Sequence, residues 1–167
     1  LWIDEADVHQ GLKFDGRIAE DFKLATGTFV SVGPLRAKII AAGAPYIQDA
    51  VITGINGNEV GALVFPTQAV RKLAGLPADA PLQDVLQSAS VQAHFRNVLN
   101  QCAATATGSA TRVARMHLLH EPPSIDKGEV TDKGSVNQRA VLKHRDALVQ
   151  ALHGGALPFT LIPEAKP

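Results

Sequence analysis

Hydrophobic and polar positions change their spacing several times along the chain, and each spacing predicts a different element. Residues 23–32 alternate loosely between apolar and polar side chains, which predicts extended backbone, and Gly27 permits a bend within it. A helix is expected next, with Pro34 in its first turn and Gly43 at its C-cap. Its apolar face consists of Leu35, Ile39 and Ile40.

Two apolar, partly β-branched runs follow, over residues 49–54 and 59–65, and both predict strands. The segment between them, Ile55-Asn-Gly-Asn58, contains Asn-Gly, which is the strongest short-range signal for a β-hairpin. Pro66 ends the second strand, because proline cannot donate to a strand ladder. A further strand is predicted over residues 112–120.

Helical patterns lie between these strands. Residues 67–75 predict a short helix closed by Gly75, and residues 76–89, which include two prolines, predict a linker with one or two helical turns. The clearest helix spans residues 90–106 and can be capped by Ser90. Its apolar positions follow the helical period: Val91, Phe95, Val98, Leu99 and Cys102.

A second strong amphipathic helix is predicted over residues 136–152 and ends at the glycine pair 154–155. Ser135 can cap it, with Asn137 or Gln138 in the first turn. Together these elements predict a small α+β domain, with a mostly antiparallel sheet and two to three helices packed on it.

Charge, cysteine content and the length of apolar runs exclude several classes of protein and of binding partner. Sixteen basic and sixteen acidic side chains leave no net charge, so neither nucleic acid nor a membrane is expected as a partner. Cys102 is the only cysteine, which excludes an internal disulfide and is typical of a reducing cytoplasm. No apolar run approaches the roughly 18 residues of a transmembrane helix, and the first residues do not have the basic-then-apolar pattern that a leader would be expected to show. Because the chain begins at Leu1 rather than Met, we interpret it as part of a longer polypeptide.

Residues 14–33 carry the most informative motif, FDGRIAEDFKLATGTFVSVG. An Asp-Gly turn, an acidic pair and a glycine separate its phenylalanines, a mixture that a purely structural core segment would not contain. The pattern Arg-x-x-acidic-x-Phe-Lys-Leu-Ala-x-Gly resembles the crossover between the large and small domains of acyl-CoA synthetases that work through an acyl-adenylate. Within that family it looks most like the feruloyl-CoA synthase group.

Residues 122–142, PPSIDKGEVTDKGSVNQRAVL, resemble the C-terminal signature of the same family, in which a threonine-rich loop presents a lysine before the last helix. In the family this lysine reaches carboxylate and phosphate oxygens during adenylation, where an ammonium group can neutralise developing charge. Direct superposition places Ser135 at the lysine, with Lys133 two positions earlier and Lys127 eight. Lys133 is the favoured candidate, since Gly134 permits an open loop. The alternative is that Lys133 and the aspartate before it are simply a solvated pair.

The resemblance also implies a division into domains. Residues 1–18 would be the end of a large domain and the crossover, and residues 19–167 a mobile C-terminal lid domain with a helical insertion at about 66–111. In the family, this domain swings between a pose for adenylation and a pose for acyl transfer. The hinge would consist of Arg17, Ala19 and Glu20. The family usually has Asp or Lys at the position of Ala19, but a hinge needs backbone freedom more than side-chain chemistry. An ordinary charged turn is the alternative.

Gly27 corresponds by resemblance to the glycine of a loop that enters the active site during thioester formation. We expect Lys23, Thr26 and Gly27 to line the passage for coenzyme A, since a glycine lets the backbone approach a thin pantetheine arm. The alternatives are a β-bulge glycine without a ligand and a solvated lysine.

The whole enzyme would use ATP with Mg²⁺ to form an acyl-adenylate from a carboxylic acid, a hydroxycinnamate such as ferulate, and would then transfer the acyl group to coenzyme A. A large N-terminal domain of the same polypeptide would hold the acid. The chain is therefore expected to be inactive alone and to bind none of these molecules tightly by itself. A non-catalytic α+β interaction module, binding a partner through the Gly27 face, is the competing hypothesis.

The sequence does not favour a metal site, a reactive cysteine or a known nucleotide-binding or nucleophile motif. His117 and His120 are three residues apart in a predicted strand and should point to opposite faces, without an acid or Cys cluster to complete a metal site. Cys102 lies on the apolar stripe of its helix, which predicts a buried, unreactive thiol. The sequence contains neither a P-loop motif nor a Gly-x-Ser-x-Gly nucleophile elbow.

Overall fold

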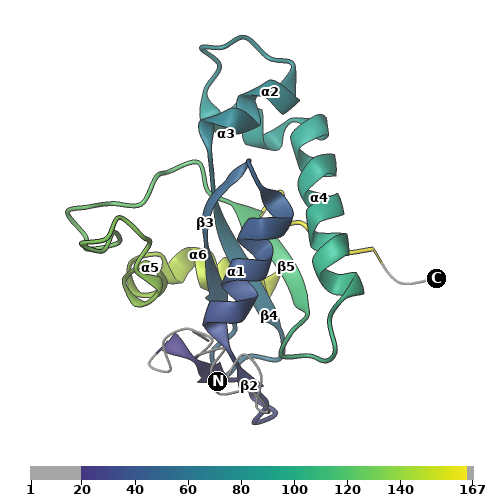
Figure 1. Ribbon diagram of the computed structural model, residues 1–167, viewed down its shortest axis with the longest axis vertical. Coiled ribbons are helices and arrows are strands. Elements are labelled where there is room, and N and C mark those ends of the chain that lie inside the picture. The colour runs from purple at the N-terminus through teal and green to yellow at the C-terminus, as the bar shows by residue number, and fades with distance from the viewer. Residues whose placement is uncertain (1–19, 165–167) are drawn as a thin grey trace, which may run out of the picture.

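A three-stranded sheet in the order β3-β4-β5 lies at the centre of the fold (Figure 1). The computed structural model describes residues 20–164. The strands are β3 (Ile47–Thr53), β4 (Val60–Pro66) and β5 (Val113–Leu118). β3 and β4 are antiparallel, whereas β4 and β5 are parallel. Every residue of β4 is buried, as expected for a middle strand that is covered on both faces.

Two helices, α1 (Val32–Gly43) and α4 (Ala89–Ala104), cover one face of the sheet (Figure 1). They bury the side chains that point to that face at alternate strand positions. The sheet contributes Ala50, Ile52, Ala62, Val64 and Met116 to this core, and the two helices contribute Leu35, Ile39, Phe95 and Leu99.

The opposite face is covered by two shorter helices, α5 (Gln138–His144) and α6 (Asp146–Gly154). A second, smaller core lies beneath them and contains Val51, Leu63, Phe65, Val141 and Leu152. Because adjacent strand residues point to opposite faces, Ala50 and Ile52 pack toward α1 and α4 while Val51 packs toward α5 and α6.

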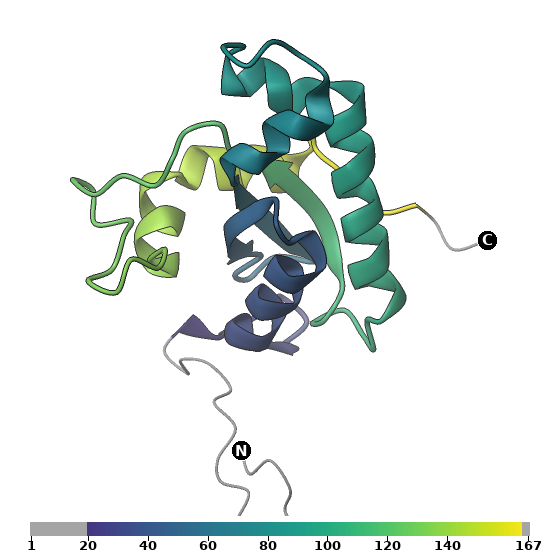
Figure 2. The ribbon, with the colours of Figure 1, turned by 45° about the horizontal axis from the view of Figure 1, so that its top comes forward.

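A small second sheet precedes α1. It consists of β1 (Phe22–Lys23) and β2 (Phe29–Val30), which pair antiparallel as a short hairpin. Figures 1 and 2 show this hairpin at one end of the domain and the short helices α2 and α3 at the other.

Residues 67–112 connect β4 to β5. They contain the 3₁₀ helix η3 (Gln68–Val70), α2 (Arg71–Ala74), α3 (Leu82–Gln87) and α4. Parallel strands require a long crossover connection, so the stretch interpreted above as a helical insertion carries the chain across the sheet from β4 to β5.

Most of the predicted elements are confirmed. The Asn-Gly segment joins β3 to β4 as a hairpin, with a positive φ of 55° at Asn56. Gly75 closes α2 in the left-handed conformation, and the strand predicted over residues 112–120 is β5. The sheet pairs are mostly antiparallel, as predicted, with β4–β5 as the parallel pair.

Three helix boundaries were wrong. Gly43 is the last residue of α1, and its C-cap is Ala44 in an extended conformation. The N-cap of α4 is Ser88, so Ser90 lies inside the first turn. The N-cap of α5 is Asn137 rather than Ser135, because the Asn137 side chain accepts a hydrogen bond from the Ala140 amide at 3.3 Å.

The single helix predicted over residues 136–152 was also wrong. It is two helices, α5 and α6, separated at Arg145, where φ is −108° and ψ is 27°. The guanidinium group of Arg145 binds the carboxylate of Glu129 and lies over the Phe65 ring, 5.1 Å from its centroid. Helical periodicity carries no information about such long-range contacts.

Candidate functional site

The first predicted site segment is a tight hairpin. The Leu24 amide donates to the Thr28 carbonyl at 2.9 Å, and the Gly27 amide donates to the Leu24 carbonyl at 2.8 Å. Gly27 has a φ of +82°, and a Cβ atom added there would meet no atom within 4 Å. Backbone conformation alone therefore requires this glycine. It lies in the turn between β1 and β2 rather than in a β-bulge.

The hairpin is anchored by apolar side chains and exposes its tip. The anchors are Phe22, Leu24 and Val30, all buried. Lys23, Thr26 and Gly27 are all exposed. Phe29 is 51% exposed, which is unusual for a side chain of this size and leaves an apolar surface beside the glycine turn.

Two backbone hydrogen bonds hold the hairpin against the loop between β3 and β4. The Asn56 amide donates to the Lys23 carbonyl at 3.0 Å, and the Ala25 amide donates to the Gly57 carbonyl at 2.8 Å. The Lys23 side chain remains exposed while its carbonyl accepts one of these bonds. The position of the Gly27 turn is therefore tied to the central sheet.

The predicted hinge is described only in part. Arg17 and Ala19 lie outside the described residues, and Glu20 is half-buried. The neighbouring Asp21 carboxylate accepts a hydrogen bond from the Val32 amide at 2.9 Å, in the first turn of α1. An acid at this position satisfies an otherwise unpaired helix amide and interacts favourably with the helix dipole. Asp21 thus links the start of the hairpin to α1.

The second predicted site segment is the loop that carries Lys133. Val130 and Val136 form an isolated antiparallel bridge at its base. The Thr131 amide donates to the Ser135 carbonyl at 2.8 Å, and the two hydroxyl oxygens lie 2.8 Å apart. Gly134 has a φ of +78°. Lys133 is exposed at the tip of this turn, while the Ser135 hydroxyl bonds within the turn.

The leg of this loop that follows the tip, here called the descending leg, is held at Val136 by a largely buried ion pair. The Arg36 guanidinium binds the Asp49 carboxylate through Nε at 2.7 Å and Nη2 at 2.6 Å. The same two side chains bind the backbone of Val136: Asp49 accepts from its amide at 3.0 Å, and Arg36 donates to its carbonyl at 2.9 Å. Both polar groups of one loop residue are therefore fixed to α1 and β3.

The leg that precedes the tip, residues 124–130, is here called the ascending leg, and a second buried ion pair holds it at Glu129. Glu129 is 1% exposed, and its carboxylate accepts from Arg145 through Nε at 3.1 Å and Nη2 at 2.9 Å. The Ser124 amide also donates to it at 2.7 Å. The hydrogen bond from Arg145 is the largest influence on the pKa of Glu129 and lowers it, against the opposing effect of burial.

Gln138 joins the start of α5 to the edge of the sheet. Its buried amide group accepts from the Ile52 amide at 2.9 Å and donates to the Ile52 carbonyl at 2.6 Å. β3 is an edge strand of the three-stranded sheet, so these bonds satisfy backbone groups that lack a neighbouring strand.

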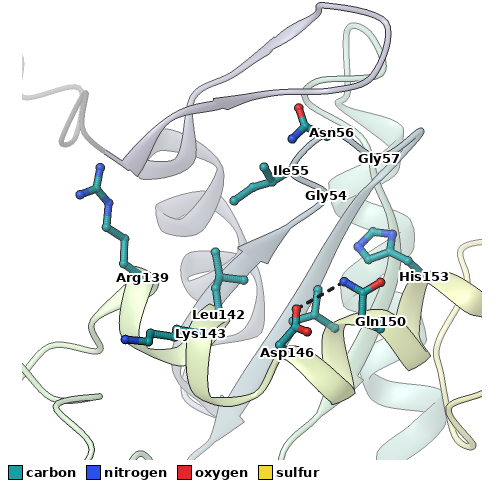
Figure 3. Close-up of a pocket in the computed structure, with 11 residues that line it drawn as sticks. Gly54, Ile55, Asn56, Gly57, Arg139, Leu142, Lys143, Asp146, Gln150 and His153 are labelled. Atoms are coloured by element: carbon teal, nitrogen blue, oxygen red, sulfur yellow. Dashed lines mark hydrogen bonds between the residues drawn. The ribbon is translucent and has the colours of Figure 1, made fainter.

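A groove of about 550 Å³ lies between the β3–β4 loop and helices α5 and α6 (Figure 3). Leu142, Val149 and Ile55 line it with apolar surface, and Arg139 and Lys143 bring positive charge to it. Those two cations are four residues apart and so share one face of α5. The Asp146 carboxylate also lines the groove, and a groove of this size and composition can hold a partly apolar ligand.

One side of the groove is formed by His153. Its Nε2 lies 2.7 Å from the Thr53 hydroxyl. Burial lowers the pKa of His153, and Arg115 lowers it further while Glu59 raises it. The neutral imidazole is therefore favoured at neutral pH, so Arg139 and Lys143 supply the positive charge.

The groove adjoins both predicted site segments, and the sequence interpretation missed it. Its loop, residues 54–57, also binds the Gly27 hairpin, and α5 directly follows the Lys133 loop. The spacing of Arg139 and Lys143 was an available signal, but it indicates only a shared helix face. The opposing loop belongs to a different part of the chain.

The prediction that His117 and His120 point to opposite faces was wrong. β5 ends at Leu118, so the strand alternation does not extend to His120, and both imidazoles line one small pocket. Burial lowers the pKa of His117, as does the neighbouring His120, while a backbone hydrogen bond with Phe159 raises it. Within residues 20–164, no group of three or more His, Cys, Asp or Glu side chains is placed to hold a metal ion.

Cys102 is buried, as predicted, and burial raises the pKa of its thiol, with a smaller opposing effect from Lys38. A raised pKa keeps the thiol protonated and unreactive. Among the described residues, no helix combines the length and apolar character needed to cross a bilayer.

Most of the chain matches the model of a known protein family. Residues 21–155 match the family model described as "AMP-binding enzyme C-terminal domain". The match includes the Gly27 hairpin, the Lys133 loop and the groove. No curated protein gives a significant match to the chain.

Solved structures with a similar fold are parts of carboxylic acid reductases. The A domain from Segniliparus rugosus, in complex with AMP and a co-purified carboxylic acid, superposes with a TM-score of 0.64 at 18% identity, covering 86% of this chain and 21% of that one. The adenylation domain from Mycobacterium chelonae gives a TM-score of 0.64 at 22% identity, covering 85% and 20%. The A-PCP didomain from Segniliparus rugosus, in complex with AMP, gives 0.60 at 20% identity, covering 81% and 17%. This chain thus spans about a fifth of the length of each.

Proposed function

The chain belongs to the family of AMP-binding enzyme C-terminal domains, and on that premise we propose that it is the mobile C-terminal domain of an ATP-dependent, AMP-forming acid–CoA ligase. The large N-terminal domain of the same polypeptide would bind the carboxylic acid and the nucleotide. The observation that carries the proposal is the family match together with two exposed turns, at Gly27 and Lys133, each tied to the central sheet.

We propose that the Gly27 turn lines the passage of the coenzyme A thiol during acyl transfer. Lys23, Thr26 and Gly27 are exposed on one hairpin, and the open space around Gly27 leaves room for a thin arm. The exposed Phe29 beside this turn supplies an apolar surface of the kind that a domain interface covers. Arg17, Ala19 and Glu20 would form the hinge between the two poses.

We propose Lys133 as the adenylation lysine. An exposed ammonium group at the tip of a braced turn can enter an active site in another domain and neutralise charge that develops on the reacting carboxylate and phosphate. The Ser135 position, which direct superposition would favour, bears a hydroxyl group that bonds to Thr131 within the turn. Lys127 lies six residues before Lys133, on the other side of the bridge between Val130 and Val136.

Mg²⁺ would enter with the nucleotide in the large domain. The described residues of this chain bring no cluster of three potential metal ligands together, and the proposal assigns none of them to the metal ion. The chemistry that this chain supplies is therefore positioning and a mobile positive charge.

A hydroxycinnamate such as ferulate is the proposed acid, and coenzyme A the proposed acceptor. The support is the resemblance of residues 14–33 and 122–142 to the feruloyl-CoA synthase group. A neighbouring solved structure is described as a complex with AMP and a carboxylic acid, which agrees with activation of an acid by adenylation. At 18–22% identity those structures bear on the fold and not on the acid or the acceptor.

The proposal is tested by ATP–pyrophosphate exchange with ferulate in the full polypeptide and in residues 1–167 alone. We expect exchange in the full polypeptide and none in this chain by itself. Exchange by this chain alone would contradict the proposed division of labour. Absence of exchange with every acid tried, and a coding sequence without a Ser/Thr/Gly-rich phosphate loop upstream, would favour the non-catalytic interaction module.

Within the full polypeptide, Lys133→Ala tests the lysine assignment. We expect slower adenylation, while acyl transfer from a preformed adenylate to coenzyme A continues. Lys127→Ala is the matched control, because it removes an exposed lysine that is close in the sequence but lies outside the turn closed by Val130 and Val136. An unchanged adenylation rate in Lys133→Ala would reject Lys133 as the adenylation lysine.

A further inference from the structure

The tip of the Lys133 loop, residues 131–135, adjoins Val136 of the second core but contributes no residue to either core. Residues 132–135 are exposed, and neither core includes a residue of the tip. The hydrogen bonds of Thr131 and Ser135 shape the turn itself, but they do not connect it to the domain. The position of the tip therefore depends on how the two legs of the loop are held.

The ascending leg is held through one carboxylate. Glu129 accepts two hydrogen bonds from Arg145 and one from the Ser124 amide, and its own amide donates to the Ser124 carbonyl at 2.9 Å. Its carbonyl accepts from the Asn137 amide at 2.8 Å, which joins the ascending leg to the start of α5. Residue 129 thus connects both legs of the loop.

Arg145 also binds the backbone at the start of the segment that leads to the tip. It lies between α5 and α6, over the Phe65 ring of β4, and donates to the carbonyls of Glu121 at 3.2 Å and Pro122 at 2.9 Å. The Arg145 guanidinium group therefore binds both ends of residues 121–129, the segment before the tip. The same group lies over the Phe65 ring of the central sheet.

A buried ion pair is a weak way to stabilise a fold, because loss of hydration offsets much of the attraction, and an apolar pair of similar size is often as stable. Its advantage is directional. The planar guanidinium and the carboxylate meet in a fixed two-bond geometry, which restricts where each backbone lies. The Glu129–Arg145 pair has this geometry on both carboxylate oxygens.

We propose that Glu129 is a positioning residue for the adenylation half-reaction. Together with Arg145, it holds the base of the loop so that the tip with Lys133 is presented to the large domain in one orientation. This inference rests on the proposed function of the domain. It assigns to Glu129 no contact with substrate, and it predicts that loss of the carboxylate affects the half-reaction that uses Lys133 and spares the other.

The test uses Glu129→Gln in the full polypeptide, which keeps the side-chain volume and removes the charge. We expect the kcat of ATP–pyrophosphate exchange to fall by about tenfold or more, because charge-assisted hydrogen bonds are lost. Acyl transfer from a preformed adenylate should stay within about twofold of the unchanged enzyme. Arg145→Lys keeps the charge but lacks the two-bond geometry, and we expect the same selective loss.

Glu59→Gln is the matched control. It makes the same chemical change in another Arg–Glu pair of the fold, with Arg115, at a distance from the loop in the sequence. Neither half-reaction should change. A loss of both half-reactions in Glu129→Gln, in proportion to a fall in melting temperature, would show a merely structural role and overturn the inference, as would an unchanged adenylation rate.

A second readout does not depend on activity. Trypsin cleaves after lysine, so the rate of cleavage at Lys127 and Lys133 reports local opening of the loop. We expect cleavage to accelerate by about tenfold in Glu129→Gln, since cleavage of a fast-opening segment follows its opening equilibrium, and to be unchanged in Glu59→Gln. Unchanged cleavage in both variants would overturn the inference.

Lys133→Ala separates this inference from the proposed function. If Glu129 acts through Lys133, Glu129→Gln should add no further loss of adenylation in a Lys133→Ala background, whereas independent effects would add. Additive losses would overturn the inference. If Lys133→Ala alone leaves adenylation unchanged, the lysine assignment fails, while the selectivity and cleavage results for Glu129→Gln still decide whether this carboxylate positions the loop.

Discussion

Replacing Asp49 by alanine tests how the loop and the sheet are joined. The Asp49 carboxylate accepts two hydrogen bonds from Arg36, one from the Ala50 amide at 2.8 Å and one from the Val136 amide at 3.0 Å. The side chains of Arg36 and Asp49 are only 15% and 10% exposed. Alanine at position 49 would leave a largely buried guanidinium without its counter-charge and a buried amide without its acceptor.

The size of the effect follows from that burial. Removing one partner of a buried ion pair costs about 3–5 kcal/mol of folding free energy. For a chain of this size, Tm falls by about 2–4 °C for each kcal/mol, so we expect a decrease of about 6–20 °C. The exposed pair of Arg115 with Glu59, whose carboxylate side chain is 47% exposed, is the comparison. Glu59→Ala should cost no more than about 1 kcal/mol.

The measurement is thermal and urea denaturation of residues 1–167, followed by far-ultraviolet circular dichroism. The double variant Arg36→Met with Asp49→Leu should recover only the part of the loss that comes from the unpaired guanidinium, because it removes both charges together but leaves the Val136 amide and carbonyl without their side-chain partners. A cost for Asp49→Ala equal to that of Glu59→Ala would refute the reasoning, since it would mean that burial of the pair has no energetic consequence.

Three further outcomes are expected. Gly27→Ala should lower the free energy of unfolding by about 1 kcal/mol, because φ is +82° there and the space around it is open; an unchanged urea midpoint would contradict a strained turn. Gln138→Leu should cost about 1–3 kcal/mol for each backbone group of Ile52 left unsatisfied, measured by the same denaturation and compared with the exposed Gln150→Leu. The hydrogen bond from Arg145 lowers the pKa of Glu129. The stabilisation from this carboxylate is therefore complete above the ordinary glutamate pKa and is lost as pH falls through the lower folded-state pKa. Glu129→Gln should accordingly flatten the acid side of the stability–pH curve, and an identical slope would exclude Glu129 as its source.

The two ion pairs, together with the buried Val136 side chain, hold the base of a loop whose tip contributes no residue to either core. Asp49 with Arg36 fixes one leg, and Glu129 with Arg145 fixes the other. Neither ion pair includes Lys133. The two pairs therefore hold the loop without using the ammonium group for which the adenylation role is proposed. The same division holds in the hairpin, where buried phenylalanine and leucine anchor an exposed glycine turn.

The fold was predictable wherever its signal is local. The Asn-Gly turn, the β-branched runs of β3 and β4, and the apolar stripe of α4 each depend on residues within one element. The candidate turns at Gly27 and Lys133 were located for the same reason, since glycine and polar residues in short apolar surroundings mark exposed turns. The residue roles assigned to them remain predictions.

The sequence alone, by contrast, did not predict the break between two helices at Arg145, the shared pocket of His117 and His120, or the groove between the β3–β4 loop and α5. Each depends on partners from distant parts of the chain. Asp49 binds Val136 across 87 residues, and Gln138 binds Ile52 across 86. Periodicity reports which face of an element is apolar, but the choice of partner for that face, and for each buried polar group, is made only when the elements pack together.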